Sequence, residues 1–287
     1  MSDRLVHRIA KPAAQYRLYC FPWAGGGAGF YGQWGKIFPS TVEENFQKRL
    51  RSRQVEDSAI SRKCITVHGV TYIVCSIRLP GRESRYGEPR YEDAATLVKE
   101  VTQTLLPEFK EKPFAFFGHS MGAHLGFEIA RYLKENHKME PLHLTVSGTS
   151  APHSELRKAN TSHLSRLPDD EFTKKIIEIG GTPKEVSDNK ELMKLFIPTL
   201  KSDFKLVENY SFEYPASGPV LTCPVTTFDG SEDRPHDMKA WGDLSKGDFS
   251  SYVLPGGHFY LFDKDNQKKL AGYLTQIFHV NDAMDIV

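Results

Sequence analysis

The chain has 287 residues and a formal net charge of +1, from 37 basic and 36 acidic side chains. This balance predicts no general attraction to polyanions and argues against nucleic acid as a partner. The hydrophobic content of 39%, with 11% aromatic residues, is ample for a globular core. Because no internal repeat and no dividing linker is visible, we expect one α/β domain over residues 1–287 rather than two small ones.

The cysteines and the distribution of apolar residues indicate the cellular compartment in which the protein is expected. The four cysteines, Cys20, Cys64, Cys75 and Cys223, form no C-x-x-C pair and no metal-ligand spacing, so we expect no bound metal. Cys20, Cys75 and Cys223 lie in apolar, strand-like runs and are expected to act as small hydrophobes. Residues 1–15 are expected to be a loose leader without the apolar core of a signal peptide. No stretch approaches the roughly 20 apolar residues that cross a bilayer. We therefore expect a cytosolic protein without a membrane span.

The first predicted strand, 16–21, ends at Pro22 and is followed by a glycine-rich loop, W-A-G-G-G-A-G at 23–29. A phosphate-binding loop is the rival reading, but the segment has neither G-x-x-x-x-G-K-[ST] nor a well-spaced G-x-G-x-x-G. In a serine hydrolase, such a loop supplies one N–H to the oxyanion hole. The amide of Ala24 is the favoured donor, with Trp23 as the alternative.

Residues 44–73 stand out from their surroundings. A basic, polar run at 48–53 is better explained as a solvated loop or short helix than as a docking patch. Residues 65–77 are strongly β-prone, and His68-Gly69 is placed as in a hairpin turn. The second core strand is predicted over 71–79.

The central motif lies at 113–126. A predicted helix over 92–109 precedes the apolar run 114–117, which leads into G-H-S-M-G at 118–122, and a helical pattern then continues to about Glu135. This is the strand–turn–helix context in which G-x-S-x-G presents a nucleophilic serine, here Ser120. The backbone N–H of Met121, at the start of the helix, points toward a developing oxyanion.

Strands and helices alternate further, which predicts a mostly parallel sheet covered on both faces, with its active site at the carboxyl ends of the strands. A strand is expected at 142–147. The alternation breaks over 151–219, where helices at 172–179 and 191–210 predict a lid. Its apolar residues could line an acyl channel, although most are expected only to pack; they are Leu192, Leu195, Phe196, Ile197, Leu200, Phe204 and Leu206.

The last third supplies partners for Ser120. Strands are predicted at 220–228 and 249–254, a short helix near 237–241 and a closing helix over 266–278. His258 follows a strand and a Gly-Gly pair, so the order serine, acid, histidine is that of an α/β-hydrolase. Four acids compete for the middle role, namely Asp229, Glu232, Asp233 and Asp237. Spacing favours Asp233. His119 and His124, beside the nucleophile, are interpreted as pocket wall and helix surface.

Several longer motifs together resemble one family. They are F-P-W-A-G-G-G (21–27), L-P-G-R-E-S-R (79–85), G-H-S-M-G (118–122), G-G-T-P (180–183), D-G-S-E-D (229–233) and P-G-G-H-F (255–259). The chain resembles type II thioesterases, and most closely the animal medium-chain thioesterases of fatty acid synthase. The resemblance implies an α/β-hydrolase fold with a helical lid and a triad of Ser120, Asp233 and His258.

The resemblance also implies an activity. It is the hydrolysis of medium-chain fatty acyl thioesters on the phosphopantetheine arm of the acyl carrier domain of fatty acid synthase, without metal or redox cofactor. We expect a monomer, although the sequence leaves the oligomeric state open. Alternatives are an editing thioesterase of a polyketide or nonribosomal peptide synthase, a carboxylesterase or lipase, and a non-catalytic carrier-protein binder. Arg78, Arg82 and Arg85 could meet an acidic carrier domain, but structural roles are more common for such arginines. The family pattern has no counterpart for 44–73, which we interpret as an inserted segment.

Overall fold

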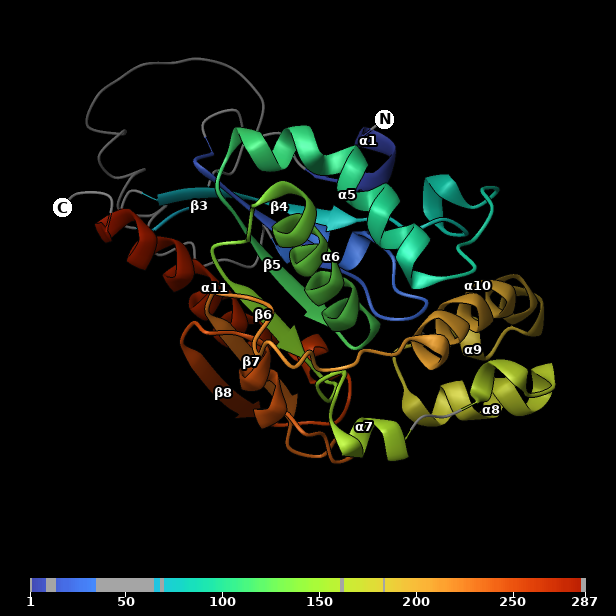
Figure 1. Ribbon diagram of the computed structural model, residues 1–287. Helices are drawn as coiled ribbons and strands as arrows, with labels where there is room; N and C mark the ends of the chain where they lie inside the picture. The colour runs from blue at the N-terminus through green and yellow to red at the C-terminus, as the bar shows by residue number, and fades with distance from the viewer. Residues whose placement is uncertain are drawn as a thin grey trace, which may run out of the picture.

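One mixed β-sheet organises the computed structural model, which describes residues 2–8, 14–34, 65–67, 70–160, 163–182 and 184–284 (Figure 1). The strand order is β1-β4-β2-β5-β6-β7-β8, and β3 also pairs with β4. The strands are β1 Val6–His7, β2 Tyr16–Phe21, β3 Ile65–Val67, β4 Val70–Ile77, β5 Phe114–His119, β6 Leu144–Ser147, β7 Val225–Gly230 and β8 Phe249–Leu254. Every pairing from β4 to β8 along this order is parallel.

The central strands are buried on both faces because helices cover each side of the sheet. In β5, Phe114 and Phe116 pack into one apolar cluster, whereas Ala115 and Phe117 pack into the other. This alternation follows from the two-residue period of a strand. A near-continuous apolar run is typical of a parallel strand covered on both faces.

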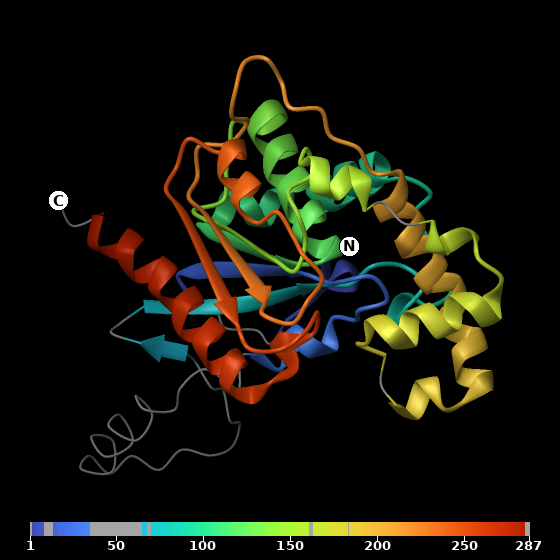
Figure 2. The same cartoon turned by 90° about the horizontal axis from the view of Figure 1, so that it is seen from below.

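Four helices form these two layers. Helices α5 (Ala94–Glu111) and α6 (Met121–His137) cover one face, and α2 (Gly29–Gly32) and α11 (Lys264–Met284) cover the other (Figure 2). Asp93 caps α5 by accepting a hydrogen bond from the Thr96 amide at 2.7 Å. A mostly parallel sheet with helices on both faces is the α/β-hydrolase architecture that the sequence predicts.

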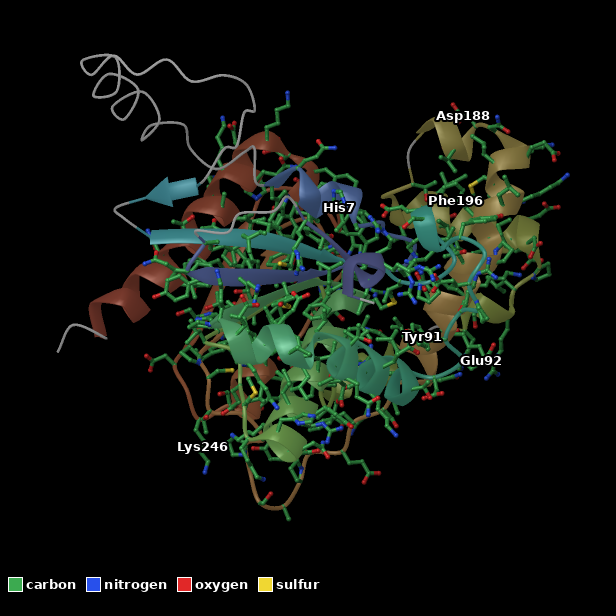
Figure 3. The ribbon with its side chains drawn as sticks, turned by 90° about the horizontal axis from the view of Figure 1, so that it is seen from above. His7, Tyr91, Glu92, Asp188, Phe196 and Lys246 are labelled. Atoms are coloured by element: carbon green, nitrogen blue, oxygen red, sulfur yellow. The ribbon has the colours of Figure 1, made fainter. Side chains whose placement is uncertain are left out.

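The segment between β6 and β7 is helical, as predicted, and lies to the right of the sheet in Figure 1. It comprises α7 (Glu155–Ala159), α8 (Asp169–Ile179), α9 (Lys184–Ser187) and α10 (Lys190–Asn209). Helices α8 and α10 share a small apolar cluster of their own, formed by Phe172, Ile176, Met193, Ile197 and Leu200. Phe196 lies on α10, while Tyr91 and Glu92 lie beside the same segment on the loop before α5 (Figure 3).

The prediction of a loose leader is wrong for the described part of residues 1–15. Helix α1 (Ser2–Leu5) leads into β1, which pairs antiparallel with the end of β4. Leu5 and Val6 are buried against the core. A two-residue strand carries too little periodicity to be recognised in a sequence, so this edge became visible only through its tertiary partner.

Only the end of the 44–73 segment falls within the described residues. Strand β3 pairs antiparallel with β4, with Val67 opposite Val70, as expected for the predicted hairpin. The basic run at 48–53 and the turn at 68–69 lie outside the described residues, as does Cys64. Cys20, Cys75 and Cys223 are buried free thiols, as predicted.

Several predicted boundaries shift, two of them in the last third of the chain by several residues. The short helix expected near 237–241 is a 3-10 helix over Lys239–Leu244, and the strand expected from Val220 begins at Val225. Proline at 224 removes a backbone donor just before β7, which sets the start of regular pairing. Among the helices of the described ranges, none combines the length and apolar character needed to cross a bilayer.

Candidate active site

Ser120 occupies a strained turn between β5 and α6. Its backbone has φ 55° and ψ −118°, a region that non-glycine residues rarely adopt. A Cβ at Gly118 would lie 2.1 Å from the carbonyl oxygen of Gly122, and one at Gly122 would lie 2.1 Å from that of Phe21. Both glycines of G-H-S-M-G are therefore required by close backbone approach.

His258 and Asp233 meet at the carboxyl ends of β7 and β8. The Nδ1 of His258 lies 2.7 Å from Oδ2 of Asp233, and both side chains are nearly buried. The Glu232 amide donates to the carbonyl of Gly256 at 2.9 Å, which ties the two loops together. Burial alone raises the pKa of Asp233, but the hydrogen bond from His258 and the nearby imidazoles hold this pKa below its ordinary value. Asp233 is thus a carboxylate at neutral pH.

One pocket brings Ser120 and His258 together with the glycine-rich loop. Trp23, Ala24 and Gly25 line it as well, and with its open mouth it has about 560 Å³ of space. Met121 is the first residue of α6, so its N–H has no acceptor within the helix. The Gly25 amide donates to Asp203 instead of facing the pocket. Trp23 and Ala24 remain the two candidate donors from this loop.

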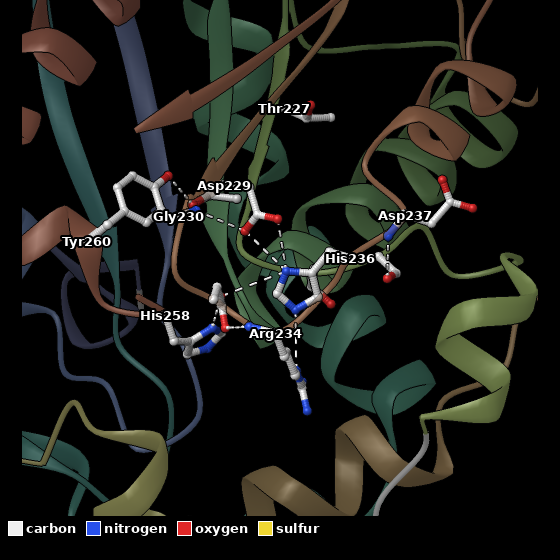
Figure 4. A network of polar contacts seen from close by, with 12 residues as sticks. Thr227, Asp229, Gly230, Arg234, His236, Asp237, His258 and Tyr260 are labelled. Carbon is white, nitrogen blue, oxygen red and sulfur yellow. Dashed lines mark hydrogen bonds and ion pairs between the residues drawn. The ribbon is translucent and has the colours of Figure 1, made fainter. Parts of the chain in front are cut away.

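The four competing acids occupy different places, and Figure 4 labels two of them, Asp229 and Asp237. Asp229 contacts Nδ1 of His236 with both oxygens at 3.1 Å and accepts the Gly230 amide. Asp237 accepts the amide of Ala240 and so caps the following turn. Glu232 is exposed. Of these four carboxyl groups, Asp233 is the one that pairs with His258.

His236 is a neighbour that sequence reasoning missed. Its ring lies between Asp229 and Asp233, 3.8 Å from Oδ2 of Asp233, and its Nε2 accepts the Nε–H of Arg234 at 3.3 Å. Asp233, His236 and His258 offer three ligand atoms within 4.8 Å of one another, which a metal ion could use. We assign them to the hydrogen-bond network, because both Nδ1 atoms already pair with carboxylates. Spacing alone gave no signal that separated His236 from the other histidines.

The interpretation of the two histidines beside the nucleophile needs correction. His124 is buried and not on the helix surface: its Nε2 lies 3.1 Å from Oγ1 of Thr149, and its ring packs against Trp241. His119 is fully buried behind the pocket wall, with Nδ1 2.8 Å from Oγ of Ser147. Helical spacing places His124 on the same face as buried Phe127, and this face turns inward because the 210–244 region covers it.

His119 and His124, which are buried, and His143, which is partly buried, predict a pH-dependent stability. Burial lowers the pKa of His119 and His124 well below the ordinary value and that of His143 to about 4. The unfolded chain binds protons at these positions as pH falls through about 6.5, whereas the folded chain does not. We therefore expect the free energy of unfolding in urea to decrease between pH 7.5 and 5.

The matched variants are His143→Gln and His163→Gln, since His163 is exposed. The first is expected to flatten the pH dependence between pH 7.5 and 5, and the second to leave it unchanged. Equal slopes for the wild type and both variants would show that His143 does not contribute to it.

The helical segment supplies the apolar side of the pocket. Of the seven candidates, Phe196, Leu200 and Phe204 line it, together with Ile176, Ile179 and Val186, which sequence reasoning did not single out. Leu192 and Leu195 are exposed, whereas Ile197 and Leu206 belong to packed clusters. The helical period predicted an apolar stripe here. Which of its side chains line the pocket and which pack against neighbouring helices depends on how α8 and α10 cross.

Comparison with known proteins assigns the chain to a family. The family profile of the thioesterase domain matches residues 70–278. The human protein named S-acyl fatty acid synthase thioesterase, medium chain, is 38% identical over 276 residues, covering 94% of this chain and 90% of its own. The crystal structure of human thioesterase 2 superposes with a TM-score of 0.65 at 31% identity, over 93% of this chain and 97% of that one. ClbQ, from the colibactin NRPS/PKS pathway, superposes with a TM-score of 0.74 at 25% identity, over 94% and 100%.

Each of these likenesses covers more than nine tenths of the chain. The chain belongs to the thioesterase family, whose members are hydrolases acting on thioesters.

Proposed function

We propose that the protein is a serine hydrolase that releases medium-chain fatty acids from the phosphopantetheine arm of the acyl carrier domain of fatty acid synthase. One observation carries the proposal: a single pocket joins Ser120 and the Asp233-bound His258 to an apolar wall from α8 and α10. The name of the human relative, a medium-chain thioesterase of fatty acid synthase, supports the substrate class. The proposal places a monomer in the cytosol and needs no metal or redox cofactor.

The first half-reaction acylates Ser120. Its Oγ attacks the thioester carbonyl while Nε2 of His258 accepts the hydroxyl proton. The carbonyl oxygen becomes an oxyanion that accepts hydrogen bonds from the N–H groups of Met121 and Ala24, with Trp23 as the alternative to Ala24. When the C–S bond breaks, the imidazolium returns the proton to the departing thiolate, so the phosphopantetheine thiol leaves neutral.

The second half-reaction regenerates the serine. His258 takes a proton from water, the resulting hydroxide attacks the acyl ester, and the proton passes to Oγ of Ser120 as the free fatty acid leaves. Asp233 accepts the Nδ1–H of His258, which leaves Nε2 as the basic nitrogen and stabilises the imidazolium. No other group needs to change its charge.

The apolar wall determines the expected substrate preference. Each buried methylene contributes about 0.8 kcal/mol of binding free energy. An acyl chain that reaches Phe196 and Phe204 therefore binds more tightly than a two-carbon chain. If half of that gain is realised over eight methylenes, kcat/KM for a decanoyl group on carrier protein exceeds that for an acetyl group by at least about 100-fold. A series from acetyl to palmitoyl carrier protein measures this.

Two results, one from that series and one from a parallel series of oxygen esters, would favour other functions. A preference for acetyl groups would favour an editing thioesterase, a function consistent with the pathway named for ClbQ. Faster hydrolysis of oxygen esters of matched chain length would favour a carboxylesterase. The Ser120→Ala variant is the blank for each substrate.

We also propose that 44–73 is an added segment that the catalytic core tolerates. Most of it lies outside the described residues, but its last residues, Tyr72 and Ile73, pair with β2. Without the segment, Thr41-Val42-Glu43 would precede Val74 and could take this place in the strand. Equal kcat/KM with and without the segment is the expected result, and a large gain on deletion would contradict it.

A further inference from the structure

Helix α10 reaches the glycine-rich loop through a buried ion pair. Nη2 of Arg82 lies 2.7 Å from Oδ1 of Asp203, and the two side chains are only 7% and 4% exposed. The second carboxylate oxygen of Asp203 accepts the Gly25 amide at 2.7 Å. Nη1 of Arg82 donates to the carbonyl of Gly26 at 3.0 Å. The pair therefore holds an N–H and a C=O of the same short loop.

This loop contains the candidate oxyanion donors, since Gly25 follows Ala24 directly. Gly25 has a φ of +78°, and a Cβ there would lie 2.3 Å from Cδ2 of Leu200 on α10. The loop is thus pressed against the helix at the position where Asp203 binds it. Because adjacent peptide planes share a Cα, fixing the Gly25 amide restricts the direction of the Ala24 amide as well.

We propose that Asp203 and Arg82 are positioning residues that orient the glycine-rich loop for oxyanion stabilisation. They do not touch the substrate, and the inference rests on the proposed function. An oxyanion hole is effective because its dipoles are already aligned before charge develops. A buried ion pair contributes little net stability, but its directional hydrogen bonds can fix one geometry.

The two charges act as a unit. Asp203 places a negative charge next to the loop where the oxyanion forms, and Arg82 compensates it at 2.7 Å. Arg82 also donates Nε–H to the carbonyl of Pro80, so its guanidinium is held on three sides. Arg82 therefore has a structural role, which the sequence analysis favoured over contact with a carrier domain. Arg78 and Arg85 pair with Glu83 and Glu88 in the same way.

Helix α10 has other attachments that keep it in place without Asp203. Oγ1 of Thr199 donates to the carbonyl of Gly81 at 2.8 Å, and Nε of Arg90 donates to Thr199. Further along, Lys205 pairs with Glu92, one of the residues labelled beside this helix in Figure 3. Thr199 is as buried as Asp203 but does not bind the glycine-rich loop, so it is the matched control.

The test compares Asp203→Ala, Asp203→Asn and Thr199→Ala. In Asp203→Ala the loop loses its acceptor, and we expect kcat to fall about 100-fold, the loss typical of one misplaced oxyanion donor, with KM little changed. Asparagine has one acceptor oxygen for two donors, so about a tenfold loss is expected. Thr199→Ala is expected to lower the melting temperature but to keep kcat within about threefold of wild type.

Two further readouts separate positioning from a purely structural role. Affinity for a decyl trifluoromethyl ketone, whose adduct places an oxyanion in the hole, should fall in parallel with kcat. Affinity for decanoic acid should not change, and the loss in kcat should be the same at every chain length. A loss that grows with chain length, or an Asp203→Ala variant as active as Thr199→Ala, would overturn the inference.

The proposed function can fail separately from this inference. If the wild type hydrolyses no thioester, the rate at which a fluorophosphonate labels Ser120 replaces kcat, because the phosphonyl oxygen also uses the oxyanion donors. Slower labelling of Asp203→Ala than of Thr199→Ala would still support the positioning role. Equal labelling rates would overturn it.

Discussion

Replacing Ser120 by alanine is expected to lower kcat on decanoyl carrier protein by about 10⁶-fold, because no other group can form the acyl-enzyme. Ser120 lies in the turn between strand β5 and helix α6, and it lines the pocket. The positive φ of 55° is a strain that alanine relieves no better than serine, so the fold and the melting temperature should remain close to wild type. Single-turnover and steady-state rates measure the loss.

A fluorophosphonate probe provides the second measurement. It should label the wild type and fail to label Ser120→Ala. Ser154, which caps α7 through a hydrogen bond from the Arg157 amide, is the matched control, and Ser154→Ala should label at the wild-type rate. Labelling of Ser120→Ala would place the nucleophile elsewhere. Failure to label the folded wild type would support the alternative of a non-catalytic carrier-protein binder.

Much of the architecture could be predicted because, in the central part of the chain, the hydrophobic periodicity and the proline and glycine residues that end elements indicate the same boundaries. Strand β2 begins at Tyr16 and ends before Pro22, as predicted, and β8 has the predicted bounds Phe249–Leu254. The edge of the sheet could not be predicted, since β1 has two residues and is defined only by its pairing with Ile77 and Ser76. Local sequence specifies long elements, whereas short ones depend on tertiary partners.

The candidate site shows the same division. Ser120 and His258 were predicted because each follows a strand, and in a mostly parallel sheet the carboxyl ends lie at one edge. Spacing only favoured Asp233 among four acids, and the family resemblance selected it. His236 and Asp203 were missed because neither has a positional signature. His236 lies in an irregular loop, and Asp203 sits in the interior of α10, where an acidic residue usually faces solvent. Their roles emerge only from contacts between segments distant in sequence, such as Asp203 with Arg82.

The two aspartates at the end of β7 provide the sharpest test of the candidate triad. Both lie next to a histidine: Asp229 contacts His236 and Asp233 contacts His258 (Figure 4). They are four residues apart and both largely buried, with Asp229 near the end of β7 and Asp233 in the loop that follows it. A substitution to asparagine keeps the size of the side chain and removes the charge at either position.

Asp233→Asn is expected to lower kcat by about 10⁴-fold, because an amide cannot stabilise the imidazolium of His258 or hold its Nδ1–H tautomer. Asp229→Asn removes a charge that faces His236, and its kcat should stay within about tenfold of wild type. Raising the pH should restore part of the activity of Asp233→Asn only, since hydroxide can then remove the proton that the poorly oriented imidazole of His258 no longer accepts. If Asp229→Asn is as impaired as Asp233→Asn, the acid of the triad is not determined by the 2.7 Å contact to His258, and the network of four residues must act as one unit.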